Sequence, residues 1–262
     1  MTSPAQPITS ADNAHFRALL KLQQSSRERR KAARSLLDGV HLTAAYLHNI
    51  GAPEEIVVST SGLGNREIAA LIARSGLKPV VLSDGLFREL SPVTTPTGIV
   101  SVVETPRPAT PPKEPGPCVI LEDIQDPGNV GSILRSAAAA GVIEVYLSRG
   151  SVHAWSPRVL RAGMGAHFVT RIYENIDLPS FVQAYPGTVF ATRRDAALPV
   201  FSADLRGRVG LLFGNEGAGL SASVASLAHQ TISIPMPGNA ESLNVAAAAA
   251  VCLFERVRQL SS

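Results

Sequence analysis

Five polar side chains that could act on a substrate fall in or next to three short loops of this 262-residue sequence. The DPGN loop offers Asn129 and, in the helical pattern after it, Arg135. The GNEGAGL loop offers Glu216, and the PMPGNAESLN loop offers Ser242 and Asn244. The set is polar, with one cation and one carboxylate. Its chemistry is therefore hydrogen bonding and charge stabilisation rather than metal-assisted or nucleophilic hydrolysis.

The usual cofactor and metal fingerprints are missing. GLGNRE at 62–67 and GNEGAG at 214–219 do not match the glycine turn that opens a helix after a strand, and no P-loop sequence occurs. No His, Cys or carboxylate cluster has zinc spacing, and no Ser lies in Gly-x-Ser-x-Gly, so we expect no metal and no catalytic triad. Cys118 and Cys252 fit two small core residues better than a redox or metal pair.

Each of the three loops follows an apolar run and precedes a helical pattern. The runs are CVILEDI at 118–124, VGLLF at 209–213 and TISI at 231–234. Apolar runs without alternation are typical of strands covered on both faces, and strands that alternate with helices predict a parallel sheet. In such a sheet the ligand binds beyond the carboxyl ends of the strands, where all three loops would lie.

The sequence also predicts where the helices after these loops begin. Asn129 is the expected N-cap of a helix that ends at Gly141, and Ser221 is the expected N-cap of a short helix. A long final helix is expected to begin at Ser242.

The stretch IPMPGNAESLNVAAAAAV at 234–251 joins a shaped loop to a plain helix. Pro235 and Pro237 remove two backbone donors and fix φ, and Gly238 permits the close approach of a ligand or another backbone. Five alanines at 246–250 would let neighbours pack closely on several sides of the helix. High helix propensity on an ordinary helix is the alternative explanation of the alanines.

A proline-rich segment divides the chain. Six of the thirteen residues 105–117 are proline, which predicts a semi-rigid linker between a domain at 1–104 and a domain at 118–262. The first of these alternates strand-like and helical patterns, so we expect a small α/β domain; the patterns lie at 56–59, 66–76, 79–82 and 98–103.

A hydrophobic share of 45% is ample for a packed core. The sequence has no secretory signal pattern and no apolar run long enough to cross a bilayer. We therefore expect a globular, cytoplasmic protein that makes no membrane contact.

Positive charge is concentrated before the linker. Residues 1–117 carry 13 Lys and Arg against 10 Asp and Glu, whereas residues 118–262 carry 11 of each. Most of the excess lies at 17–34, where it fits contacts with nucleic-acid phosphates as well as it fits a solvated helix face. The candidate phosphate contacts of this segment are Arg27, Arg29, Arg30 and Lys31.

A second basic pair lies in the other domain. Arg158 and Arg161 are three residues apart on a helix predicted to begin after Ser156, so they project to one side. This arrangement favours contact with phosphates over a solvated face.

At the three loops the sequence resembles the SpoU family of RNA ribose 2′-O-methyltransferases, part of the trefoil-knotted SPOUT superfamily. DPGNVGSILR at 126–135, LLFGNEGAGL at 211–220 and IPMPGNAESLNVA at 234–246 match the three motifs of that family in their order. The resemblance covers the chain from about Cys118 to Leu260.

The resemblance implies an α/β fold whose C-terminal parallel-sheet domain carries a trefoil knot, with a small α/β RNA-binding domain before it. In that first domain DGVHL at 38–42 and TPTGIVSVV at 95–103 resemble a domain shared with some ribosomal proteins. S-adenosylmethionine is implied as the cofactor and a homodimer through the catalytic domain as the assembly. The implied cofactor contacts are Thr192, Gly214, Ile234, Met236 and Leu243.

For the reaction, the resemblance implies methyl transfer to a ribose 2′-hydroxyl of structured RNA, with large-subunit ribosomal RNA favoured and tRNA as the alternative. Arg135 would stabilise the developing alkoxide. The residues that would orient it, the ribose and the loops are Asn129, Glu216, Ser242 and Asn244. A protein that binds RNA without transferring a methyl group is the second alternative; it would not need these side chains, and binding of S-adenosylmethionine would distinguish the two.

Overall fold

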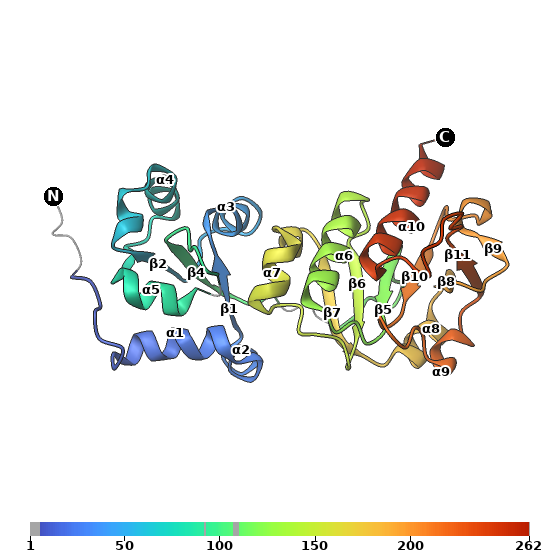
Figure 1. Ribbon diagram of the computed structural model, residues 1–262, viewed down its shortest axis with the longest axis horizontal. Coiled ribbons are helices and arrows are strands. Elements are labelled where there is room, and N and C mark those ends of the chain that lie inside the picture. The colour runs from blue at the N-terminus through green and yellow to red at the C-terminus, as the bar shows by residue number, and fades with distance from the viewer. Residues whose placement is uncertain (1–5, 92, 107–109, 262) are drawn as a thin grey trace. The chain divides into compact units, whose positions relative to one another are not determined.

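The computed structural model describes residues 6–91, 93–106 and 110–261 (Figure 1). Its contacts divide the chain into two units, each made of two segments. The first unit comprises Met1–Pro106 and Trp155–Phe168, and the second comprises Arg107–Ala154 and Val169–Ser262.

The domain boundaries proposed from the proline-rich segment stay a prediction. Residues 107–109 of that segment lie outside the described residues. The segment Trp155–Phe168 groups with the first unit, although it lies within the range 118–262 that the sequence assigns to the second domain.

The first unit is a small α/β structure around a four-stranded sheet. The strand order is β1-β4-β2-β3, with β4 antiparallel to β1 and β2 and with β3 parallel to β2. Its elements are α1 (Ala14–Gln24), α2 (Ser26–Ala32), β1 (Arg34–Asp38), α3 (Val40–Asn49), β2 (Glu55–Ser59), η1 (Ser61–Gly64), α4 (Arg66–Ser75), β3 (Val80–Leu82), α5 (Asp84–Leu90), β4 (Ile99–Glu104), α7 (Pro157–Gly163) and η2 (Ala166–Phe168).

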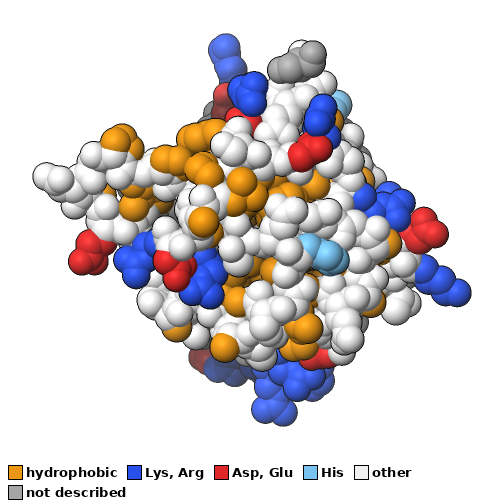
Figure 2. Space-filling view, turned by 90° about the vertical axis from the view of Figure 1, so that its right-hand side faces the viewer, with side chains coloured by type: hydrophobic (Ala, Val, Ile, Leu, Met, Phe, Trp, Pro, Cys, Tyr) orange, Lys and Arg blue, Asp and Glu red, His pale blue; other side chains and the backbone are white. Residues whose placement is uncertain are grey.

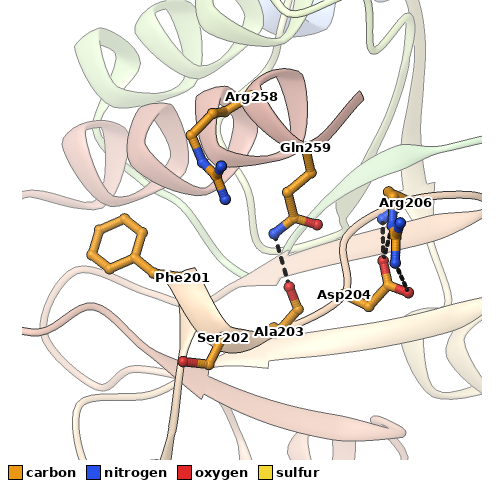
Figure 3. Close-up of a pocket in the computed structure, with 7 residues that line it drawn as sticks. All are labelled: Phe201, Ser202, Ala203, Asp204, Arg206, Arg258 and Gln259. Atoms are coloured by element: carbon orange, nitrogen blue, oxygen red, sulfur yellow. Dashed lines mark hydrogen bonds and ion pairs between the residues drawn. The ribbon is translucent and has the colours of Figure 1, made fainter. Parts of the chain in front are cut away.

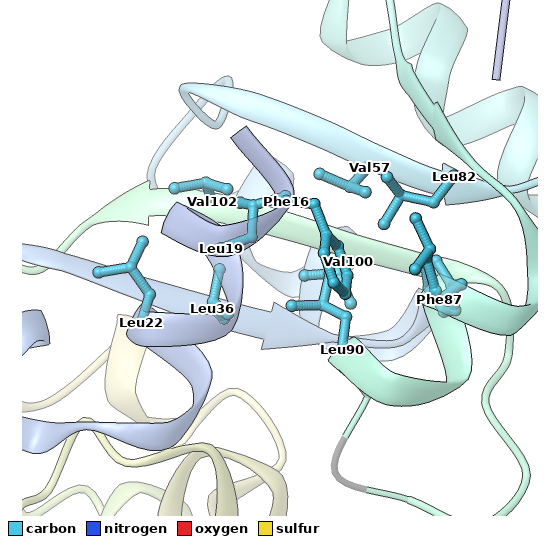
Figure 4. Close-up of a cluster of buried hydrophobic side chains, with 11 residues drawn as sticks. Phe16, Leu19, Leu22, Leu36, Val57, Leu82, Phe87, Leu90, Val100 and Val102 are labelled. Carbon is cyan, nitrogen blue, oxygen red and sulfur yellow. The ribbon is translucent and has the colours of Figure 1, made fainter. Parts of the chain in front are cut away.

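Helices cover both faces of this sheet because its strands are apolar on both sides. In β2, Val57 packs in a cluster with Phe16 of α1 and with side chains of α5 (Figure 4). Ile56 and Val58 point to the other face, where they pack against Ile68 of α4. The small α/β domain predicted before the linker is confirmed.

The second unit is built on a seven-stranded sheet of parallel strands in the order β7-β6-β5-β10-β8-β11-β9. Its elements are β5 (Cys118–Leu121), α6 (Pro127–Ala139), β6 (Glu144–Ser148), β7 (Arg171–Ile176), α8 (Leu178–Ala184), β8 (Thr188–Thr192), β9 (Leu198–Pro199), η3 (Val200–Ser202), β10 (Val209–Phe213), α9 (Ala222–Ala225), β11 (Gln230–Ser233) and α10 (Val245–Leu260).

The predicted parallel sheet is confirmed. Every residue of β5 and β10 is buried, as expected of strands covered on both faces. The two strands are neighbours, with Leu121 opposite Phe213 at their carboxyl ends. The trefoil knot stays a prediction that comes from the family resemblance.

Two of the predicted helix starts are wrong. Asp126, not Asn129, is the N-cap of α6, because Pro127 takes the first helical position and the Asp126 side chain accepts a bond from the Asn129 N–H. The final helix begins after Asn244 rather than at Ser242. The predicted cap of α9 is confirmed, since Ser221 accepts from the N–H of Val224.

Cys118 and Cys252 are buried core residues, as predicted. Burial raises the pKa of each thiol to about 12, which keeps both in the unreactive thiol form. Among the residues that the structure describes, no helix is long and apolar enough to cross a membrane. The same residues form no cluster of His, Cys and carboxylate groups that could hold a metal.

Candidate active site

Three loops meet at the carboxyl edge of the parallel sheet. They are residues 122–126 after β5, 214–220 after β10 and 234–244 after β11. The first two follow neighbouring strands, and only β8 separates β10 from β11. The structure therefore confirms the placement of the loops at the edge where parallel sheets bind ligands.

The side-chain amide of Asn129 links all three loops. Asn129 lies in the first turn of α6 and is 9% exposed. Its Nδ2 donates to Oε1 of Glu216 at 2.9 Å, and its Oδ1 accepts from Nδ2 of Asn244 at 2.9 Å. Each polar atom of the amide has a partner of the opposite role, so the neighbours fix its orientation. We call these three residues the amide network.

The backbone of the first loop also holds the Glu216 carboxylate. Oε1 accepts from the N–H of Asp126 at 3.2 Å, and Oε2 accepts from the N–H of Gln125 at 3.4 Å. Burial raises the pKa of Glu216, but the bonds from Asn129 and from backbone N–H groups outweigh it and lower the pKa overall. Glu216 is therefore an ionised acceptor near neutral pH and does not supply a proton.

Two of the five predicted catalytic residues stand outside the amide network. Arg135 is exposed on α6, and Ser242 is exposed in the third loop. Among the described residues, no hydrogen bond joins either side chain to the network.

Asn244 has a second structural role, because its Oδ1 accepts from two N–H groups in the first turn of α10. It is both an N-cap and a member of the network.

The residues implied as cofactor contacts lie at the same edge. Thr192 ends β8, and its hydroxyl donates to the carbonyl of Leu212 at 2.9 Å. Gly214 follows β10, at a point where an added Cβ would overlap the backbone of Gly219 and Leu220. Only glycine lets the second loop close so tightly on itself.

The third loop offers an apolar surface beside these polar groups. Ile234 and Met236 are half-buried, and Leu243 is 41% exposed. Large apolar side chains and backbone groups at a strand edge suit the flat face and polar rim of an adenine ring. The residues present therefore fit S-adenosylmethionine.

Sequence reasoning missed two residues that shape the site. Asp126 caps α6, and the Asp-Pro step at 126–127 carries the signal, since Pro is favoured at the first helical position. Asn215 folds the second loop: its Oδ1 accepts from the N–H groups of Gly217 and Ala218 at 3.0 Å, and its Nδ2 donates to the first loop at 2.8 Å. An Asn beside glycines is a turn signal of this kind.

The predicted RNA contacts differ in exposure. Those that are exposed are Arg27, Arg30, Lys31, Arg158 and Arg161. Arg29 is a correction: it is 4% exposed, and its Nη1 donates to the carbonyls of Leu22 and Gln23 at 2.6 and 3.0 Å. It ties α2 to the end of α1 and is not presented to a phosphate.

A hollow of about 300 Å³ lies at the other end of α10 (Figure 3). Its lining residues are Phe201, Ser202, Ala203, Asp204, Arg206, Arg258 and Gln259. Asp204 pairs with Arg206 within it, and Arg258 pairs with Glu255. Helix α10 runs for 16 residues between the amide network and this hollow, about 24 Å at the usual rise, so the hollow is not part of the site.

Comparison with known proteins assigns the class. Residues 116–254 match the sequence model of the SpoU rRNA methylase family, a stretch that contains all three loops. The chain is 27% identical to the solved structure of the SpoU methyltransferase AviRb from Streptomyces viridochromogenes in complex with AdoMet. That likeness has a TM-score of 0.84 and covers 95% of this chain and 100% of the other.

Two curated relatives are similar over nearly their whole length. The 23S rRNA (guanosine(2553)-2′-O)-methyltransferase RlmP of Bacillus subtilis is 31% identical, over 94% of this chain and 97% of its own. The 23S rRNA (uridine(2479)-2′-O)-methyltransferase of Streptomyces viridochromogenes is also 31% identical, over 98% of this chain and 94% of its own.

The fold and the site thus define an RNA ribose 2′-O-methyltransferase that uses S-adenosylmethionine. The chain belongs to the SpoU rRNA methylase family.

Proposed function

We propose that this protein methylates the ribose 2′-hydroxyl of a nucleotide in large-subunit ribosomal RNA, in the cytoplasm. The observation that carries the proposal is the amide network, which joins three loops distant in sequence into one site at the sheet edge. Ribosomal RNA is favoured over tRNA because two curated relatives that match both units of this chain, among others, are named as 23S rRNA enzymes.

The cofactor supplies a methyl group on a sulfonium, and the chain's own residues position it. In this proposal Gly214 and the third-loop residues Ile234, Met236 and Leu243 hold the cofactor, mainly through backbone groups. Thr192 borders the same slot, and its hydroxyl is held in place because it donates to the carbonyl of Leu212.

Arg135 is the residue proposed to stabilise the alkoxide that develops on the ribose. Its exposure on α6 leaves the guanidinium free to approach an RNA ribose and its phosphate. A guanidinium does not give up its proton in proteins, so the 2′-hydroxyl proton passes to an RNA phosphate or to water rather than to Arg135. Ser242, also exposed, donates to the ribose in this proposal.

The amide network positions the reacting groups and takes no part in proton transfer. Glu216 is ionised and fully engaged as an acceptor, and Asn129 is held at both ends of its amide. Their task is to keep the first and second loops in register with the start of α10, so that the reacting groups meet in line.

Two basic surfaces of the first unit hold the RNA in this proposal. One is formed by Arg27, Arg30 and Lys31 of α2, and the other by Arg158 and Arg161 of α7. Exposed cations of this kind contact phosphates without reading sequence.

We further propose a homodimer through the second unit. The outer face of α10 places apolar side chains at one-turn spacing, with Ala247 and Phe254 exposed and Val251 half-buried between them; Phe254 is 49% exposed. Hydrophobic side chains also gather on the face shown in Figure 2, with charged groups toward its margins. An apolar surface of this kind supports association with a second copy.

Calorimetry and methyl transfer test the proposed function together. We expect S-adenosylmethionine to bind, and ribosomal RNA from cells lacking the protein to accept labelled methyl groups at one 2′-hydroxyl. Transfer to tRNA alone would overturn the choice of substrate. Absence of both cofactor binding and transfer would favour an RNA-binding protein that keeps the fold, and a monomer in light scattering would refute the dimer.

A further inference from the structure

Glu122 holds both ends of the second loop. It follows β5 directly and is 8% exposed. Its N–H donates to the carbonyl of Phe213, the last residue of β10, at 2.9 Å. Its carboxylate accepts from the N–H of Ser221 at 2.8 Å and from the Ser221 hydroxyl at 2.6 Å. One residue of the first loop thus fixes the points where the second loop begins and ends.

The loop between those two points is a closed turn. Besides the bonds to its side chain, Asn215 accepts at its carbonyl from the N–H of Gly219 at 2.9 Å. Gly219 has φ of 70°, which glycine adopts without strain. A turn with this many internal bonds moves as a body. Its attachments at Phe213 and Ser221, together with the bond from Asn215 to the first loop, therefore decide where the Glu216 carboxylate meets its own partners.

We propose that Glu122 is a positioning residue for methyl transfer, which acts through Ser221 to set Glu216 against Asn129. The inference rests on the proposed function. A carboxylate suits the place because both Ser221 groups that it meets are donors, and an ionised acceptor makes the stronger bonds. An amide at position 122 would turn one donor of its own toward Ser221.

A merely structural carboxylate is available for comparison in the same unit. Glu144 begins β6, at the opposite edge of the same sheet, and is 5% exposed. It accepts from the Tyr146 hydroxyl at 3.0 Å and from the N–H of Gly116 at 3.1 Å. It also pairs with the exposed Arg171, whose Nη1 donates to it at 3.5 Å. Glu122→Gln and Glu144→Gln therefore remove similarly buried carboxylates, one near the site and one far from it, and the second gives up at least as many bonds.

The test measures thermal unfolding and single-turnover methyl transfer at saturating RNA and S-adenosylmethionine, well below the unfolding temperature of each variant. Both variants should lose stability to a similar degree. Only Glu122→Gln should slow transfer, by about tenfold or more, since small misplacements of reacting groups cost about that much or more. Glu144→Gln should transfer at the wild-type rate.

Variants at Ser221 keep the test decisive if Glu122→Gln does not fold. Ser221→Ala should slow transfer to a similar degree, while Ser221→Thr, which retains the hydroxyl, should stay near the wild-type rate. The double variant at 122 and 221 should be no slower than the slower single variant, because both act through one contact.

Three outcomes would overturn the inference: wild-type rates in Glu122→Gln and Ser221→Ala, equal slowing in Glu144→Gln, or fully multiplicative losses in the double variant. Each leaves the proposed function standing, because the wild type would still transfer methyl groups. A wild type that neither binds the cofactor nor transfers a methyl group would instead refute the proposed function, and this inference with it.

Discussion

Replacing Asn129 by aspartate tests the amide network with almost no change in shape. Nδ2 of Asn129 donates to Oε1 of Glu216 at 2.9 Å, so Asn129→Asp would set two carboxylate oxygens against each other at that distance. The acceptor that receives the bond from Asn244 would remain.

The distance sets the size of the effect. Two unit charges 2.9 Å apart repel by about 6 kcal/mol at an effective dielectric constant of about 20, and by about 1.4 kcal/mol in bulk water. Asn129 is buried and Glu216 is exposed, so a value between these limits applies. With the charge-assisted hydrogen bond that is also lost, we expect the free energy of unfolding at pH 8 to fall by about 3–5 kcal/mol.

Acid should reverse most of this loss. Two adjoining carboxylates can share one proton in the folded state, whereas both are ionised in the unfolded chain above about pH 5. The folded variant then binds more protons than the unfolded variant, so its stability rises as the pH falls, by up to about 1.4 kcal/mol per pH unit. The deficit relative to wild type should shrink to about 1–2 kcal/mol at pH 5.

Urea unfolding of both proteins between pH 5 and 8 gives the deficit directly. Asn65→Asp is the control, because the Asn65 side chain caps α4 in the first unit purely as an acceptor from the N–H groups of Glu67 and Ile68. It should change stability little at any pH. A deficit for Asn129→Asp below about 0.5 kcal/mol, or one that does not vary with pH, would refute the contact between Asn129 and Glu216.

Three further outcomes can be measured with the same materials. Arg135→Ala should leave S-adenosylmethionine affinity nearly unchanged in calorimetry but slow single-turnover transfer by about 10²–10³-fold, with little rescue by lysine; near-normal turnover would remove Arg135 from the reaction. Replacing Arg27 and Lys31 together by alanine should weaken RNA binding and flatten its salt dependence. An unchanged salt slope in that double variant would assign the two cations to a solvated face. Arg29→Ala should instead lower the unfolding temperature, because it breaks the bonds between α2 and α1. The pKa of Glu216 is lowered in the folded state, so the stability that its ionised form contributes is complete above the unfolded pKa of about 4.3 and disappears as the pH falls through the lower folded pKa. The difference in unfolding free energy between wild type and Glu216→Gln should therefore be constant above about pH 5. A difference that changes near neutral pH would contradict this reasoning.

The sheet of the second unit could be predicted from sequence because its signals are local. The apolar runs at 118–124 and 209–213 each contain an observed strand, the run at 231–234 overlaps one that begins a residue earlier, and the polar loops after them do lie at one edge. The runs that form β5 and β10 are covered on both faces, as apolar runs in a parallel sheet require, so no knowledge of their neighbours was needed.

Helix starts were harder, because several polar residues near each start could serve as the cap. Asn129 and Ser242 both have side chains that favour an N-cap, yet Asp126 and Asn244 take those positions. The Pro after Asp126 settles the first case, since it fits the first helical position and no later one. Asn129 is thereby released to bond with the other loops.

The basic segment shows what sequence cannot decide. Arg29 and Arg30 are neighbours of the same type, but a helix turns them about 100° apart, and the turn between α1 and α2 buries only the first. Which face of α2 meets α1 depends on the break at Ser25, where the side chain caps α2 and the backbone ends α1. Charge counts alone assigned both arginines to RNA.

The contacts of the amide network also set the stage of folding at which the site is complete. Asn129 is 87 residues from Glu216 and 115 residues from Asn244 along the chain, so neither bond can form through local structure. Contacts this distant in sequence form only after the intervening loops have closed. Asn244 in addition needs the first turn of α10, because its side chain caps that helix. The orientation of the Asn129 amide is therefore complete only when β11 and α10 have joined the sheet, and a chain that lacks them has neither the third loop nor an oriented Asn129. We propose that the second and third loops hold S-adenosylmethionine, and the cofactor should accordingly bind the second unit only when that unit is folded. A ligand that binds only the folded state must raise the free energy of its unfolding.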